Sequence, residues 1–198
     1  MSTSNGPAFQ IMLIRHGEKP PDSPPPYGIA IDGQQDGESL TVRGWQRAGA
    51  LACLLTSTGT VPDIHGLAEP RYLYAANPRK HRSKRSRETL EPLARKLGLE
   101  INTDFSPGQE EELATHAQSR GGVVLICWRH QQLPTLARHI LRNEQSETEW
   151  PEDRYDLVWV FDLDVAKNVY LFHQVAQNLL HGDSPVPAPE ASPAGKVG

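Results

Sequence analysis

Two long uncharged runs stand out in the pattern of hydrophobic and polar positions. The first, at residues 9–14, leads directly into an Arg-His-Gly motif at 15–17, and the second, at residues 123–128, leads into an Arg-His pair at 129–130. Apolar runs of this length, bounded by glycine or polar residues, are typical of strands buried on both faces of a sheet. We therefore expect two buried strands that each end at an arginine and a histidine.

The remaining pattern predicts helices that alternate with shorter strands. Thr41 is a typical N-cap residue, and the apolar residues between it and about Ser57 recur on one helical face. The other expected elements are strands at 71–76, 100–104, 156–162 and 169–172, and helices at about 81–97, after 106 and at 134–143. The short connection between the last two strands indicates an antiparallel hairpin at a sheet edge.

Proline marks two stretches in which regular structure is not expected. Residues 19–39 contain Pro, Gly and Asp in high proportion, which predicts a long loop that leaves the first strand and forms a rim or lid over its end. Within it, the Pro-Pro-Pro-Tyr stretch at 24–27 also matches a proline-rich ligand for aromatic grooves. A single domain is expected at 1–181, followed by a disordered tail at 182–198 that is rich in Pro and Ala.

The composition adds few constraints. The 198 residues suffice for one domain with a sizeable core, and a net charge of −4 does not by itself indicate a nucleic-acid or membrane surface. Cys53 and Cys127 lie among apolar residues and are expected to be reduced core residues. The first residues lack the pattern of a signal peptide and no apolar run is long enough to span a bilayer, so we expect a cytoplasmic protein without a membrane partner.

The arginine–histidine pairs are the candidates for chemistry. In open α/β sheets, ligands collect outside the carboxyl ends of the strands, which places Arg15 and His16 on the floor of a pocket. A guanidinium beside an imidazole suits a phosphoryl group, because its planar fork matches phosphate oxygens. Gly17 allows a sharp turn and a close ligand. Taken alone, the motif is equally compatible with a surface arginine and a hydrogen-bonded histidine at a strand end.

Further motifs along the chain favour a functional site over a surface arginine and a hydrogen-bonded histidine. A Leu-Thr-x-x-Gly-x-x-x-Ala pattern begins at Leu40, Arg85 precedes Thr89 by four residues, and His130 follows the second apolar run. Together with the Arg-His-Gly motif, they resemble the histidine phosphatase superfamily, which has the phosphoglycerate mutase-like fold, over about residues 9–130. The resemblance implies a three-layer α/β/α sandwich around a mostly parallel sheet.

The resemblance also implies roles for individual residues. His16 would attack phosphorus and form a phosphohistidine, while Arg15, Arg85, His130 and the backbone at Gly17 would bind the phosphoryl oxygens. No metal or other cofactor would be required, because guanidinium and imidazole groups supply the positive charge. The substrate would be a phosphorylated small molecule or a phosphoprotein. Hydrolysis is favoured over a mutase reaction, because the chain is shorter than typical mutases and lacks their insertions.

The residue that protonates the leaving group is open between several acids. Many members of the superfamily carry a glutamate between the second arginine and the second histidine, which points first to Glu110 and then to Glu111. Acids in the first turn of a helix also stabilise the helix dipole, which explains both residues without catalysis. A related branch uses an aspartate directly after the second histidine, and Gln131 closes that route. Glu18 and the acids at 32–38 are the next candidates.

Three other interpretations involve different chemistry. A metal site that joins His16, Glu18 and His130 is disfavoured, because the neighbouring arginines would repel a divalent cation. The basic run at 79–87 is typical of a solvated face, a nucleic-acid site or a nuclear address, but it lacks the interleaved aromatics of single-strand binding sites. A catalytically weak member of the same fold that binds phosphorylated ligands or other anions is the third alternative.

Overall fold

The computed structural model of the 198-residue chain describes residues 6–56, 66–78, 83–143 and 149–188. The strands in these ranges are β1 (Ala8–Arg15), β2 (Tyr72–Ala75), β3 (Ile101–Asn102), β4 (Gly122–Trp128), β5 (Leu157–Asp164) and β6 (Val169–Ala176). The helices are α1 (Val42–Leu54), α3 (Arg85–Leu97), α4 (Glu110–Gln118) and α5 (Leu133–Leu141). Within the described chain, the order of elements follows the order predicted from the hydrophobic pattern.

The strands form one sheet in the order β3-β2-β4-β1-β5-β6. Strands β3, β2, β4 and β1 run parallel to one another, whereas β5 is antiparallel to β1, and β6 is antiparallel to β5. The two apolar runs, β1 and β4, are therefore neighbours, with Ile11 opposite Val124 and Arg15 opposite Trp128. The β5–β6 hairpin lies at the sheet edge, which confirms the prediction from its short connection.

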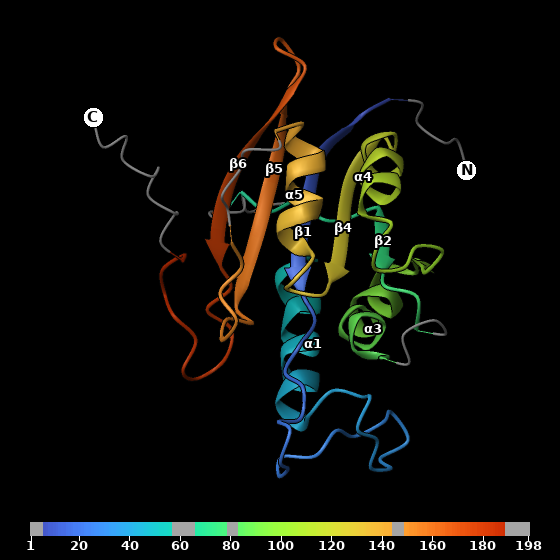
Figure 1. Cartoon of the computed structure of the whole chain (residues 1–198), viewed down its shortest axis with the longest axis vertical. Coiled ribbons are helices and arrows are strands. Elements are labelled where there is room, and N and C mark those ends of the chain that lie inside the picture. The colour runs from blue at the N-terminus through green and yellow to red at the C-terminus, as the bar shows by residue number, and fades with distance from the viewer. Residues whose placement is uncertain (1–5, 57–65, 79–82, 144–148, 189–198) are drawn as a thin grey trace.

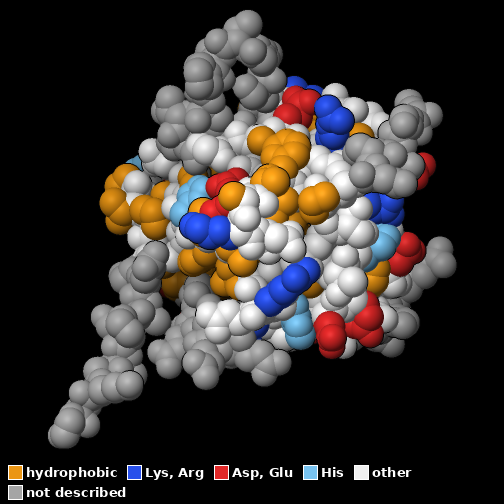
Figure 2. All heavy atoms as spheres, turned by 90° about the horizontal axis from the view of Figure 1, so that it is seen from above, with side chains coloured by type: hydrophobic (Ala, Val, Ile, Leu, Met, Phe, Trp, Pro, Cys, Tyr) orange, Lys and Arg blue, Asp and Glu red, His pale blue; other side chains and the backbone are white. Residues whose placement is uncertain are grey.

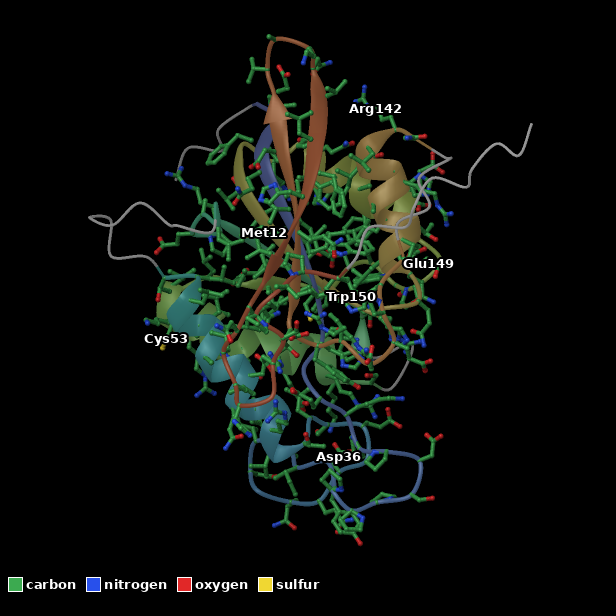
Figure 3. The ribbon with its side chains drawn as sticks, turned by 90° about the vertical axis from the view of Figure 1, so that its left-hand side faces the viewer. Met12, Asp36, Cys53, Arg142, Glu149 and Trp150 are labelled. Atoms are coloured by element: carbon green, nitrogen blue, oxygen red, sulfur yellow. The ribbon has the colours of Figure 1, made fainter. Side chains whose placement is uncertain are left out.

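The sheet is the middle of three layers (Figures 1 and 3). Met12 and Ile14 of β1 pack on one face, in the core that contains the apolar side chains of α1 and α3. Ile11 and Leu13 pack on the other face, in the core that contains those of α4 and α5. Successive side chains of a strand point to opposite faces, so β1 must be apolar at nearly every position. This arrangement confirms the predicted α/β/α sandwich with a mostly parallel sheet.

The long loop after β1 lies below the carboxyl ends of the parallel strands (Figure 1). Residues 19–39 contain no helix and only isolated bridges, such as Gly28 with Thr41. Glu88 of α3 holds the last part of the loop: its carboxylate accepts hydrogen bonds from Ser39 Oγ at 2.7 Å and from Leu40 N at 2.9 Å.

At the opposite end of the molecule, acidic, basic and apolar side chains are interspersed (Figure 2).

Two expectations differ from the structure. Cys53 is exposed on α1, because it lies off the apolar face of that helix, whereas Cys127 is buried in β4 as expected. Residues 182–188 do not behave as a disordered tail, because Asp183 forms ion pairs with α1 and Ala188 is buried in the core. Residues 189–198, the rest of the predicted tail, lie outside the described residues.

A separate observation concerns membranes. Among the described helices, we find none that combines the length and the apolar character needed to cross a bilayer.

Candidate active site

The candidate residues meet at the carboxyl edge of the sheet. Because β1 and β4 are adjacent and parallel, the Arg-His motif after β1 and the Arg-His pair after β4 end at the same edge. The amide of His16 donates to the carbonyl of Trp128 at 3.3 Å, which extends the pairing of the two strands by one residue. Sequence positions that are more than a hundred residues apart thus share one site.

His16 is buried and held in a single tautomer. Its Nδ1 lies 2.7 Å from the carbonyl oxygen of Gly17, and since a carbonyl only accepts, Nδ1 carries the proton. Burial lowers the pKa of His16 to about 3; the Gly17 hydrogen bond opposes this shift, and the charges of Arg15, Arg85 and His130 add to it. The imidazole is therefore neutral near pH 7, with its Nε2 lone pair available, and three cationic or titratable groups lie close to it.

Arg15 is almost completely buried without an acidic partner. Its Nη1 donates to the main-chain carbonyls of Glu152 and Arg154, and its Cζ lies 3.8 Å from the ring centroid of Tyr155. Burial lowers its pKa, although the charges of Tyr155 and nearby acids oppose the shift. Among the described residues, no carboxylate forms an ion pair with Arg15. The positive charge of this guanidinium is therefore not neutralised by a described carboxylate and is available to an anionic ligand.

Arg85 begins α3 and reaches the loop that follows β1. Its Nη2 donates to the carbonyl of Gly37 at 2.6 Å, and Glu38 lies 3.8 Å away on the rim. Four residues later, the hydroxyl of Thr89 donates to the carbonyl of Arg85 at 2.7 Å and accepts from the amide of Gly17 at 2.8 Å. The spacing of Arg85 and Thr89 thus ties the start of α3 to the residue that follows His16.

Two glycines explain why the motif after β1 needs small residues. A Cβ on Gly17 would lie 2.9 Å from the carbonyl oxygen of Gly44, and a Cβ on Gly44 would lie 2.6 Å from that of Glu18. Thr41 adds a cap, because its hydroxyl accepts from Gly44 N and donates to Glu18 O. The first turn of α1 thereby packs directly on the backbone after His16. Gly17 serves this close approach, rather than the sharp turn expected from the sequence.

His130 completes the group of residues predicted from the sequence. Burial lowers its pKa to about 4, with Arg15 and Lys19 acting in the same direction and Glu152 opposing them. Its Nδ1 is buried and has no hydrogen-bond partner within the part of the chain that the structure describes. It is thus a neutral imidazole near pH 7, with a polar atom left for a ligand.

Unpartnered polar atoms point to the same edge of the sheet. Buried side-chain atoms without a hydrogen-bond partner among the described residues are Nε of Arg15, Nε of Arg85, Oγ of Ser106, Nδ1 of His130 and Oε1 of Gln132. They come from four separate segments, each of which ends or follows a parallel strand of the sheet. Buried polar groups are normally hydrogen-bonded, so unpartnered ones at this edge mark a place where a polar ligand can bind. The two guanidinium groups make an anion the matching ligand.

Glu110, the acid predicted from the sequence, lies at the start of α4. It is buried, and its carboxylate accepts from Gly108 N at 3.0 and 3.1 Å and from Trp128 Nε1 at 3.1 Å. Its Oε1 therefore ties α4 to the end of β4. Glu111 is exposed on the same helix. No described contact joins either carboxylate to His16 or His130, and a catalytic role for Glu110 stays a prediction.

The segment before β5 was not singled out in the sequence. Residues 152–155 supply the carbonyls and the ring that surround Arg15, and the Tyr155 ring lies 6.2 Å from that of His16 between centroids. The sequence predicts that β5 forms a hairpin with β6, but it does not predict that β5 pairs with β1. Without that pairing, nothing in the sequence places residues 152–155 at the site.

The basic run contributes in part to this edge. Lys84 pairs with Asp36 at 2.7 Å, and Arg87 is exposed in the first turn of α3. Residues 79–82, which hold the rest of the run, lie outside the described residues. A cavity of about 770 Å³ also lies along α3, lined by Arg87, Glu91 and Arg95 among others, but none of the predicted site residues lines it.

Comparisons with known proteins agree with this arrangement at the level of the fold. No protein-family model and no curated protein sequence matches the chain. The protein histidine phosphatase SixA, solved with tungstate, is 16% identical and aligns over 85% of this chain and 97% of its own, with a TM-score of 0.53. An Escherichia coli K-12 protein assigned as an alpha-ribazole-5'-P phosphatase is 12% identical, aligns over 85% and 97%, and has a TM-score of 0.50. The chain therefore has the fold of the histidine phosphatases.

Proposed function

We propose that this protein is a metal-independent phosphatase that hydrolyses phosphoric monoesters through a phosphohistidine on His16. The observation that carries the proposal is the state of His16: it is neutral, its Nδ1 is engaged by the Gly17 carbonyl, and Nε2 is available to attack. A nucleophile held in this way needs no further base to remove a proton.

The charged groups around His16 suit the phosphoryl group in transit. Arg15 and Arg85 supply guanidinium donors to the non-bridging oxygens, where negative charge is spread in the transition state. His130 supplies a further polar atom at the same edge. Because these groups provide the electrostatic stabilisation, the proposed reaction proceeds without a metal ion.

The comparisons support the same class of reaction. SixA is a protein histidine phosphatase, and the tungstate in its structure is a tetrahedral oxyanion like phosphate. The Escherichia coli neighbour is also assigned as a phosphatase, of a small phosphorylated molecule. For this chain we accordingly propose either a phosphorylated small molecule or a phosphoprotein as the substrate, and a cytoplasmic location.

The test compares His16→Ala with His181→Ala, which alters an exposed histidine outside the site. We expect the first variant to lose turnover of an aryl phosphate and the second to retain it, with both variants folded by circular dichroism. Excess chelator should leave the activity of the wild type and of His181→Ala unchanged. Normal turnover in folded His16→Ala would overturn the proposal, as would loss of wild-type activity on chelation. Phosphate binding without any turnover would favour the anion-binding alternative.

A further inference from the structure

The antiparallel pairing of β5 brings an unexpected segment to the active edge. Leu13 of β1 lies opposite Trp159 of β5, so continuing this register places the residues just before β5 next to the end of β1. Segment 149–156 therefore approaches the site from the side opposite β4. Figure 3 shows Trp150, in this segment, near the lower ends of the strands, with the loop that holds Asp36 below it.

The backbone of this segment is fixed against Arg15. The Glu152 carbonyl accepts from Arg15 Nη1, the Arg154 carbonyl accepts from the same nitrogen at 3.2 Å, and the Tyr155 ring stacks under the guanidinium. Trp150 adds a hydrogen bond from its indole nitrogen to the Arg154 carbonyl at 2.8 Å. Glu152 is consequently anchored beside the arginine that binds the phosphoryl group in the proposed reaction, while its own side chain is exposed.

The charge of Glu152 acts on Arg15 and on His130. Its carboxylate raises the pKa of Arg15 and opposes the lowering of the pKa of His130, so it lies within electrostatic reach of both residues. Asp153, the next residue, acts on the pKa of Arg15 but is not among the groups that shift the pKa of His130. The geometry that holds Glu152 at the site is that of its backbone, whose carbonyl accepts from Arg15 Nη1, and its charge acts on the two groups on either side of His16.

Glu110 is placed differently. Its carboxylate is buried and already accepts hydrogen bonds from the Gly108 amide and the Trp128 indole. A proton donor must reach the leaving-group oxygen and exchange its proton with solvent, and the exposed side chain of Glu152 meets the second need directly.

We propose that Glu152 is the acid–base catalyst of the site, an inference that rests on the proposed phosphatase function. His16 Nε2 forms a bond to phosphorus while the bond from phosphorus to the ester oxygen breaks, and the Glu152 carboxyl gives its proton to that oxygen. The resulting carboxylate then takes a proton from water as the water oxygen attacks phosphorus and the phosphorus–nitrogen bond breaks. The alcohol and phosphate leave, and both residues return to their starting states.

The experiment measures turnover of two phosphate monoesters whose leaving groups differ in how much they need a proton to depart. An aryl phosphate with an acidic phenol departs without much help, whereas an alkyl phosphate needs a proton in the transition state. We expect Glu152→Gln to lower turnover of the alkyl phosphate by about a hundredfold or more and that of the aryl phosphate by only a few-fold, in line with typical contributions of general acids. Asp153→Asn is the matched control, because it removes the same charge one residue away, and it should leave the ratio of the two rates unchanged.

Several outcomes would overturn the inference while leaving the proposed function intact. Equal loss on both substrates in Glu152→Gln would mean that the residue acts through Arg15 rather than by proton transfer. A change in the ratio for Glu110→Gln instead would restore the prediction made from the sequence. If His16→Ala retains wild-type turnover, or the wild type has none, the phosphatase function fails and this assignment fails with it.

Discussion

Two buried arginines, Arg15 at the active edge and Arg47 on α1, show how differently this protein treats the same charge. Each of these residues is 1% exposed. Arg47 forms ion pairs with Glu18 at 2.8 Å and with Asp183 at 2.7 Å, and its third partner is the Gln177 side chain at 3.0 Å. Arg15 has two carbonyls and an aromatic ring instead.

Their titration follows from these partners. Burial alone would lower the pKa of Arg47, but hydrogen bonds with Asp183 and Glu18 raise it above its ordinary value. For Arg15, burial prevails and the pKa is lowered. A compensated charge such as Arg47 stabilises the fold by joining the chain after β6 to the residues after His16. An uncompensated charge such as Arg15 costs stability and is available to an anionic ligand.

The largest effect we expect is the loss of stability in Arg47→Met. Removing this guanidinium leaves the buried carboxylate of Asp183 and the partly buried carboxylate of Glu18 with the exposed Arg43 as their ion-pair partner among the described residues, so the free energy of unfolding should fall by about 3–5 kcal/mol. Urea denaturation measures this change. Arg43→Ala is the control, because an exposed ion pair contributes at most about 1 kcal/mol. A loss in Arg47→Met as small as in the control would mean that the network does not stabilise the fold.

Arg15→Met should affect activity strongly and the stability of the fold less than Arg47→Met does. Among the described residues no carboxylate loses an ion-pair partner, and the buried charge itself costs stability, so the free energy of unfolding should not fall as it does in Arg47→Met. Turnover of an aryl phosphate should fall by about a hundredfold to a thousandfold, the usual result of removing one preorganised donor. Steady-state kinetics and urea denaturation of the same samples test both parts. Full activity in a destabilised variant would show that Arg15 is structural.

A smaller difference is expected along α3. Arg85→Ala should reduce turnover by about a hundredfold, because its guanidinium lies at the site, whereas Arg87→Ala should change it by only a few-fold. Arg87 is exposed and provides the matched control, since both variants remove one positive charge from the same basic run. Equal losses in the two variants would indicate that the run acts as a diffuse field.

The smallest effect concerns pH. The pKa of His16 is about 3 in the fold and 6.5 as its ordinary value, so between these values the unfolded chain binds more protons than the folded one. The free energy of unfolding should therefore fall as the pH is lowered from about 6.5 toward 3, and His16→Asn should make that fall less steep. An unchanged slope in His16→Asn would contradict the buried, neutral state of His16.

Local patterns in the sequence were sufficient for the elements and for the residues next to them. The apolar runs of β1 and β4, the Thr41 cap and the β5–β6 hairpin each depend on neighbours within a few residues, so they were predicted correctly. Arg15, His16 and His130 were identified because they directly follow strands and match a known motif order. The structure places them together, with Arg85, at one edge of the sheet.

Only the tertiary structure decided what surrounds these residues. The contact of Arg15 with Glu152 joins positions 137 apart in the sequence, and it depends on β5 pairing with β1 in one antiparallel register. The network of Arg47 depends in the same way on how the chain after β6 returns to α1. Such contacts leave no periodic trace in the sequence. The hydrogen-bond partners of Arg15 are main-chain carbonyls, which every residue has, and those of Arg47 are single acids and an amide with the local pattern of any exposed polar residue. The compensated arginine and the uncompensated one therefore look alike in the sequence and differ only in the fold.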